Sequence, residues 1–132
     1  MNKVAMALLT KDKTELSAQT CKPLLQPNKF DLFWIDGSST AAGERFPYDM
    51  SEKEQVSIHV CSNVRGGAGA GLVFALTEML KGPYTHVGLC EQDVLCSGDW
   101  FDRSFALFDI GLRDGFSVGA VSARCYADRV LF

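Results

Sequence analysis

The chain has 132 residues, of which 47% are hydrophobic and 22% are charged. This length predicts one compact domain spanning residues 1–132, and the composition excludes a disordered or low-complexity chain. Lys and Arg number 13 against 16 Asp and Glu, for a formal net charge of -3. Because no stretch concentrates the basic residues, no nucleic-acid partner is expected.

Neither a transmembrane segment nor a secretory leader is predicted. The longest apolar run near the start, Val4 to Leu9, is far shorter than the roughly 20 residues that span a bilayer, and it lacks the features of a signal peptide. The five cysteines are odd in number and form no Cys-x-x-Cys pair, which excludes a disulfide scaffold or a zinc ribbon. We therefore expect a cytoplasmic protein in which Cys61 and Cys90 are small buried hydrophobes.

The first predicted elements are a strand and a helix. The run Val4–Leu9 is continuously apolar, which is typical of a parallel strand covered on both faces. Asp12 and Glu15 have the spacing of a capping box and predict a helix whose apolar stripe runs over 16–25. Pro23 is expected to kink or shorten that helix.

A second strand and a long loop follow. Phe30–Ile35 is apolar and ends at Asp36, before a cluster of turn-forming residues. Thr40 to Gln55 has no sustained periodicity, and Gly43 and Pro47 interrupt it further. We expect a loop there, and loops of this length are usually functional or mobile.

Two further strands flank a glycine-rich helix. The alternation from Val56 to Val60 predicts a strand at the sheet edge. Six residues, Gly66 to Gly71, consist of glycine and alanine and precede a run of helical periodicity that ends at Gly82-Pro83. Thr85–Cys90 reads as a fourth strand.

The last predicted elements are a helix and a fifth strand. Ser97 or Asp99 is the expected cap of the helix and Gly115 its end, and Val118–Ala123 is the expected strand. The predicted buried stripe of the helix is Phe101, Phe105, Phe108 and Leu112. Strands that alternate with helices predict an α/β fold: an open, mostly parallel, Rossmann-like sheet with helices on both faces.

Polar residues follow four of the predicted strands. In open parallel sheets, ligands bind outside the carboxyl ends of the strands. The segments that would meet there are Thr10-Lys11-Asp12, Asp36-Gly37-Ser38, Asn63 to Gly71, and Glu91-Gln92-Asp93.

Glu91 and Asp93 flank Gln92, so in an extended segment their side chains point to the same side. Two carboxylates placed together suit Mg²⁺ or Mn²⁺, with waters and substrate phosphates completing the coordination shell. The alternative is that either residue caps the following helix or pairs with Arg65 or Arg103.

The glycine run also has two interpretations. Backbone N–H groups at a helix start bind phosphate well, whereas glycines equally permit close packing of helix on sheet. A dinucleotide-binding fingerprint does not fit, because that motif follows the first strand of its unit. A P-loop is excluded because no Gly-Lys-Ser/Thr follows the glycines.

Four features in this order resemble the donor-binding, amino-terminal half of family 2-like glycosyltransferases of the GT-A fold. They are the first strand Val4–Thr10, the acidic Gly-Ser turn within Phe33–Thr40, the glycines Gly66–Gly71 opening a helix, and Glu91–Val94 in the place of the Asp-x-Asp motif. The resemblance spans nearly the whole chain.

The resemblance implies a nucleotide-diphosphosugar donor bound at the strand ends and a sugar transferred to an acceptor. Asp93 would ligate a Mn²⁺ or Mg²⁺ on the diphosphate, with Glu91 assisting. The metal would stabilise charge on the leaving nucleotide diphosphate. The other residues implied in donor binding are Thr10, Lys11, Asp12, Asp36, Gly37 and Gly67, with Asp36 at the base or ribose.

The chain also departs from the family pattern. Glu91 stands where the first aspartate of the motif is usual, and the acceptor-binding half that carries the general base of inverting members would be missing. An exposed sheet face would then favour self-association into a homo-oligomer. The alternative function is a noncatalytic GT-A-fold module that binds without turnover.

Overall fold

The computed structural model of the protein describes residues 2–122. The chain divides into two compact units, Met1–Val94 and Leu95–Phe132. Among the described residues, the first unit holds one four-stranded sheet in which every pair is parallel. Its strands, in the spatial order β3-β2-β1-β4, are β1 (Val4–Thr10), β2 (Asp31–Asp36), β3 (Ile58–Cys61) and β4 (His86–Glu91).

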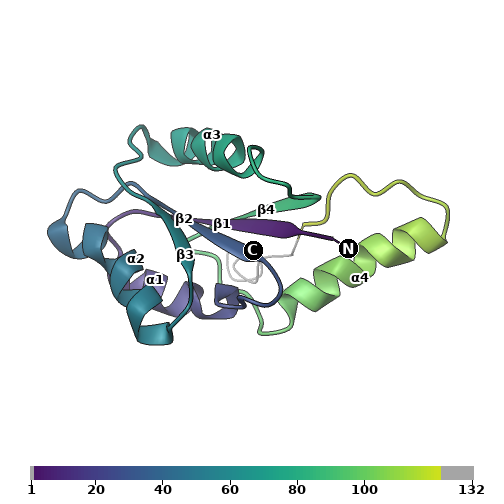
Figure 1. The fold of residues 1–132 in the computed structure, drawn as a ribbon, viewed down its shortest axis with the longest axis horizontal. Helices are drawn as coiled ribbons and strands as arrows, with labels where there is room; N and C mark the ends of the chain where they lie inside the picture. Colours follow the sequence, from purple (N-terminus) through teal and green to yellow (C-terminus); the bar gives the residue numbers. More distant parts are fainter. Residues whose placement is uncertain (1, 123–132) are drawn as a thin grey trace, which may run out of the picture. The chain divides into compact units, whose positions relative to one another are not determined.

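Helices cover both faces of this sheet (Figure 1). On one face lie α1 (Thr14–Thr20), the short 3-10 helix η1 (Lys22–Leu24) and α2 (Ala41–Glu54), and on the other lies α3 (Gly67–Met79). The predicted Rossmann-like α/β fold is therefore confirmed. So are the edge position of the third strand and the shortening of the first helix before Pro23.

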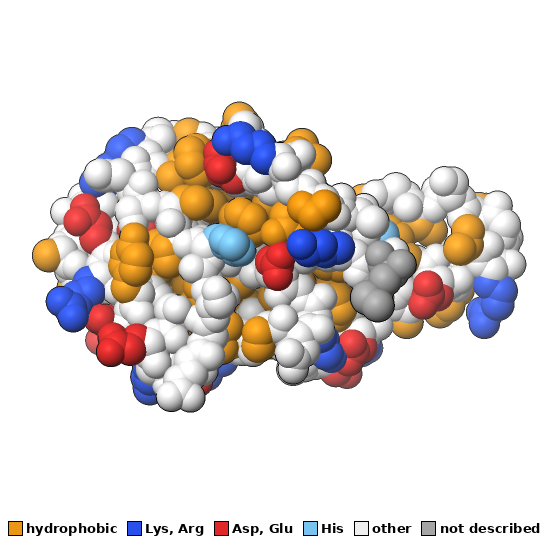
Figure 2. Space-filling model, in the orientation of Figure 1, with side chains coloured by type: hydrophobic (Ala, Val, Ile, Leu, Met, Phe, Trp, Pro, Cys, Tyr) orange, Lys and Arg blue, Asp and Glu red, His pale blue; other side chains and the backbone are white. Residues whose placement is uncertain are grey.

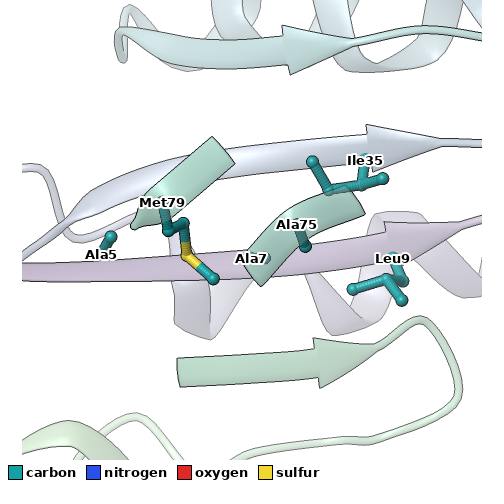
Figure 3. Packing of buried hydrophobic residues seen from close by; sticks show 6 residues of the cluster. All are labelled: Ala5, Ala7, Leu9, Ile35, Ala75 and Met79. Atoms are coloured by element: carbon teal, nitrogen blue, oxygen red, sulfur yellow. The ribbon is translucent and has the colours of Figure 1, made fainter. Parts of the chain in front are cut away.

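Small side chains on β1 allow α3 to pack closely on the sheet (Figure 3). Because side chains alternate along a strand, every second residue of β1 faces α3. A Cβ on Gly71 of α3 would stand 3.2 Å from Leu9 Cδ2, so glycine keeps the helix start close to the end of β1. The buried cluster comprises Ala5, Ala7, Leu9, Ile35, Ala75 and Met79.

The opposite face of the sheet is filled by larger side chains. Leu8 and Trp34 are fully buried there, and the rings of Trp34 and Phe46 meet edge to face, with centroids 5.7 Å apart. This burial of an aromatic ring holds α2 against β2.

The outward side of α3 is also apolar. Hydrophobic side chains gather on the surface over this helix (Figure 2). Val73 of α3 is 64% exposed, and Leu80, which follows its last residue, is 72% exposed. The helix is therefore apolar on its inner and its outer side, although only the inner side packs on the sheet. In residues 2–122, no helix is both long and apolar enough to cross a membrane.

The expected loop over Thr40–Gln55 is wrong, because residues 41–54 form the helix α2. Gly43 and Pro47 look like helix breakers in the sequence, yet both are buried and share one face with Met50. This i, i+4, i+7 spacing is a helical stripe built from unusually small or rigid residues. The helix ends at Gln55, whose left-handed backbone closes it.

The expected fifth strand is also wrong within residues 118–122, which belong to no strand, while Ala123 lies outside the described residues. A strand there would place Val118 and Val121 on opposite faces, with Gly119 between them, so neither face would bury much apolar area.

The second unit contains α4 (Trp100–Arg113). This helix begins after Asp99 and ends shortly before Gly115, whose backbone is left-handed. Its predicted buried stripe holds in part: Phe101 is buried, but Leu112 is 75% exposed. Phenyl rings instead pack along the helix, with the Phe101 and Phe105 centroids 4.8 Å apart.

Thr40 caps α2, because its side chain accepts a hydrogen bond from the Gly43 N–H at 3.1 Å. We expect Thr40→Ala to lower the free energy of unfolding by about 1 kcal/mol, measured by urea denaturation. Thr77→Ala is the control, since the Thr77 hydroxyl bonds Val73 O in the middle of α3. An equal loss in both variants would contradict the capping role.

Candidate functional site

A cavity of about 330 Å³ opens where β1 and β4 end and α3 begins. Six of the residues predicted to bind donor or metal line it: Thr10, Lys11, Gly37, Gly67, Glu91 and Asp93. Parallel strands bring these segments to one edge of the sheet, as the topology requires. Asp12 and Asp36, the remaining two, do not line it.

Asp36 joins the ends of two strands instead. Its side chain is fully buried, and its Oδ1 accepts hydrogen bonds from Thr10 Oγ1 at 2.9 Å and Ser38 Oγ at 2.6 Å. Trp34 Nε1 in turn donates to Thr10 Oγ1 at 2.8 Å. Asp36 Oδ2 is buried without a hydrogen-bond partner in the described part of the chain. The predicted contact of Asp36 with a base or ribose stays a prediction.

Asp12 binds the loop that follows β2, and the predicted capping box is wrong. Its backbone is left-handed (φ 56°), and its carboxylate accepts four hydrogen bonds, from both the backbone N–H and the hydroxyl of Ser39 and Thr40, at 2.7–2.9 Å. The first helix begins after Lys13 with no side-chain cap. Four donors from Ser39 and Thr40 would lose their acceptor if Asp12 turned to the helix, which explains why its carboxylate bonds the loop instead.

The glutamate and aspartate beside Gln92 lie in a turn rather than an extended segment. Val94 N donates to Glu91 O at 3.1 Å, and Gln92 and Asp93 form the turn between them. The prediction of an extended segment is therefore wrong, yet both acidic residues line the same cavity.

Neither acidic side chain forms an ion pair with another residue in 2–122. The two arginines that could neutralise them bind elsewhere: Arg65 lies 3.5 Å from Glu44 and Arg103 lies 3.9 Å from Asp99. The helix-capping alternative also fails, because α4 begins after Asp99.

Gln92 connects this turn to β1, a role that the sequence analysis missed. Its Oε1 accepts from Lys11 N at 2.9 Å and its Nε2 donates to Lys11 O at 3.3 Å. Its backbone N–H also donates to Leu9 O at 3.0 Å. No pattern in the sequence signals this contact, because the two residues are 81 positions apart.

The structure bears out close packing, one of the two interpretations of the glycine run, while phosphate binding stays a prediction. Gly71 provides close packing against Leu9, while Gly66 and Gly67 have left-handed backbones (φ 105° and 82°) and line the cavity. The first turn of α3 has neither a side-chain cap nor an acidic residue. Its N–H groups and the positive end of the helix dipole therefore favour an anion at this wall of the cavity.

Arg65 is a second lining residue that the sequence analysis did not assign to the site. Its Nη1 donates to Gly37 O at 2.9 Å and its Nη2 donates to Asn63 Oδ1 at 2.8 Å, which hold the guanidinium at the cavity while half of the side chain stays exposed. Together with Lys11, it adds positive charge to the cavity that Glu91 and Asp93 also line.

The acidic residues of the cavity suit a cation that takes its remaining ligands from a bound substrate. No group of three or more His, Cys, Asp and Glu side chains that could hold a metal occurs within residues 2–122. Two carboxylates remain, and Mg²⁺ is typically bound by one or two carboxylates with water and phosphate oxygens in the other positions. The residues present therefore fit Mg²⁺ or Mn²⁺ held together with a diphosphate.

No protein-family model matches the chain, and no curated protein matches it in sequence. Two crystal structures of TarS from S. aureus, a glycosyltransferase, share its fold. One has a TM-score of 0.64 at 12% identity, and that of TarS 1–349 has 0.63 at 13%. Both alignments cover 83% of this chain, which spans only 20% and 33% of those chains. The fold is therefore glycosyltransferase-like.

Hydrogen bonds, above all from the Ser39 hydroxyl, hold the pKa of Asp12 well below its usual value of 3.8. A carboxyl whose pKa is lower in the folded state stabilises the fold above its unfolded pKa and loses that contribution as the pH falls. The free energy of unfolding should thus drop more steeply for the wild type than for Asp12→Asn as the pH falls from about 5 to about 2. Urea titrations at each pH measure this, and parallel curves would contradict it.

Proposed function

We propose that the chain binds a nucleotide-diphosphosugar together with Mg²⁺ or Mn²⁺ and forms the donor-binding part of a glycosyltransferase of the GT-A type. The observation that carries this proposal is that Glu91 and Asp93, without ion-pair partners in residues 2–122, line the same cavity as the uncapped start of α3. The glycosyltransferase-like fold supports it.

The charges around the cavity suit a diphosphate. The Asp93 carboxylate would ligate the cation, with Glu91 beside it, and the cation would join these acids to the phosphate oxygens. The α3 N-terminus, Lys11 and Arg65 offer donors and positive charge to the remaining oxygens. When bound, the metal acts as a Lewis acid that stabilises charge on the leaving nucleotide diphosphate.

The nucleoside would lie against the end of β1 and the turn after β2. Lys11 and Gly37 line this part of the cavity, and a Cβ at position 37 would stand only 2.8 Å from Val64 O. Glycine is therefore needed where the two loops approach each other. Asp36 would contribute indirectly, because its hydrogen bond holds Thr10 in place. Asp12 would do so by holding the loop at Ser39 and Thr40.

The cavity residues account for donor binding, but no residue is assigned as the general base of sugar transfer. The two are separable by experiment. A noncatalytic module binds the donor without consuming it, whereas a competent transferase hydrolyses it slowly or transfers its sugar when an acceptor is supplied.

Asp93→Ala tests the metal role. In calorimetric titrations with UDP or GDP in the presence of Mn²⁺, we expect the variant to bind about tenfold more weakly or worse, which corresponds to about 1.4 kcal/mol. The control is Asp49→Ala, which removes an exposed carboxylate on α2 that pairs with Arg45. Equal affinities of wild type and Asp93→Ala would refute the role of Asp93.

Ala68→Glu tests the anion site at α3. Ala68 lies in the first turn of the helix and lines the cavity. A carboxylate at this position interacts favourably with the helix dipole but repels a phosphate. We expect unchanged or slightly raised stability and about tenfold weaker binding of UDP with Mn²⁺. The neutral variant Ala68→Gln is the matched control for size, and equal binding by both variants would count against a phosphate at this wall.

A further inference from the structure

We propose that Gln92 is a positioning residue whose side chain fastens the acidic turn to the end of β1 and so holds Glu91 and Asp93 in a geometry that binds a cation. The inference rests on the proposed function, because it concerns the same cavity. It assigns a role to a residue between the two acids that does not itself touch the cation.

The Gln92 amide takes the place of a strand at the point where the β1–β4 pairing stops. The last pair in the register is Leu9 with Glu91. Beyond it the chain turns, so the backbone of β4 no longer reaches the N–H and C=O of Lys11. The Gln92 side chain bonds both groups, at 2.9 Å and 3.3 Å, as a further strand residue would.

A third contact fixes which way the amide points. Ser17 Oγ of α1, which is buried, donates to Gln92 Oε1 at 3.4 Å. Because the Lys11 N–H can only donate, the oxygen of the amide must face it, and a flipped amide would oppose two donors. The side chain thus links β1, α1 and the turn in a single orientation.

These bonds restrain the two acids through the backbone. Glu91 and Asp93 are exposed, and neither is held by an ion pair with a residue in 2–122. The residue between them is held by its backbone bond to Leu9 O at 3.0 Å and by its side chain. A turn that is already ordered loses less conformational entropy when its two carboxylates bind a cation, and the affinity is higher for that reason.

Gln92→Met tests the proposal, because methionine has a similar length but cannot replace the two hydrogen bonds to Lys11. Gln19→Met on α1 is the matched control, since Gln19 is exposed. UDP affinity is measured by calorimetry with Mn²⁺ and again with a chelator, and hydrogen exchange of the Lys11 amide is measured by NMR in the free protein. Thermal unfolding reports whether each variant is folded.

We expect Gln92→Met to reduce the gain in UDP affinity that Mn²⁺ provides by about 10- to 100-fold, as for other residues that orient metal ligands. The metal-free affinity should fall much less than the affinity with Mn²⁺, and the Lys11 amide should exchange faster than in the wild type. A purely structural role would lower both affinities alike, so that result overturns the proposal, as does an unchanged Mn²⁺ effect.

The wild-type protein alone gives two further outcomes. Exchange of the Lys11 amide at the rate of an open peptide would overturn the proposal even if Gln92→Met failed to fold. A protected Lys11 amide without any effect of Mn²⁺ on UDP binding would instead refute the proposed function itself, and the positioning role with it. Failure confined to the variant refutes the inference alone.

Discussion

The hydrogen bond from Thr10 Oγ1 to Asp36 Oδ1 ties the last residues of β1 and β2 together at the edge where the cavity opens. A buried carboxylate is costly unless it is hydrogen-bonded, so Asp36 restrains every group that satisfies it. Those groups are Thr10 and Ser38, and through them Trp34 and the backbone of Asp12. The positions of the loops after β1 and β2 follow from this one buried group.

At the β4 and α3 walls of the cavity, exposed charges rather than a buried carboxylate are the main feature. Glu91 and Asp93 supply negative charge from a turn after β4, while the uncapped α3 helix supplies positive potential from its first turn. Opposite charges that line one cavity suit a ligand that carries both an anionic diphosphate and a cation. The likeness to TarS concerns the fold alone.

Sequence reasoning recovered most of the architecture because the apolar runs of the buried strands are hard to mistake. It failed over Thr40–Gln55, where a helical stripe is built from Gly43, Pro47 and Met50, residues that local propensity does not associate with a buried helix face. It also failed at Asp12, because two alternatives compete for that carboxylate. The nearby helix start needs one cap, whereas Ser39 and Thr40 offer four donors from across the sheet edge.

The sequence by itself determined the order of the four strands and of α1, α3 and α4. It also determined the edge of the sheet at which the polar segments gather, since both depend on periodicity within short windows and on parallel topology. Only the tertiary structure decided that Asp12 and Asp36 hydrogen-bond the ends and loops of the strands without lining the cavity, while Arg65 and Gln92 line it. The physical reason is that each of these assignments depends on hydrogen bonds between residues distant in the chain, such as Lys11 and Gln92, and a directional bond of about 3 Å leaves no trace in local composition.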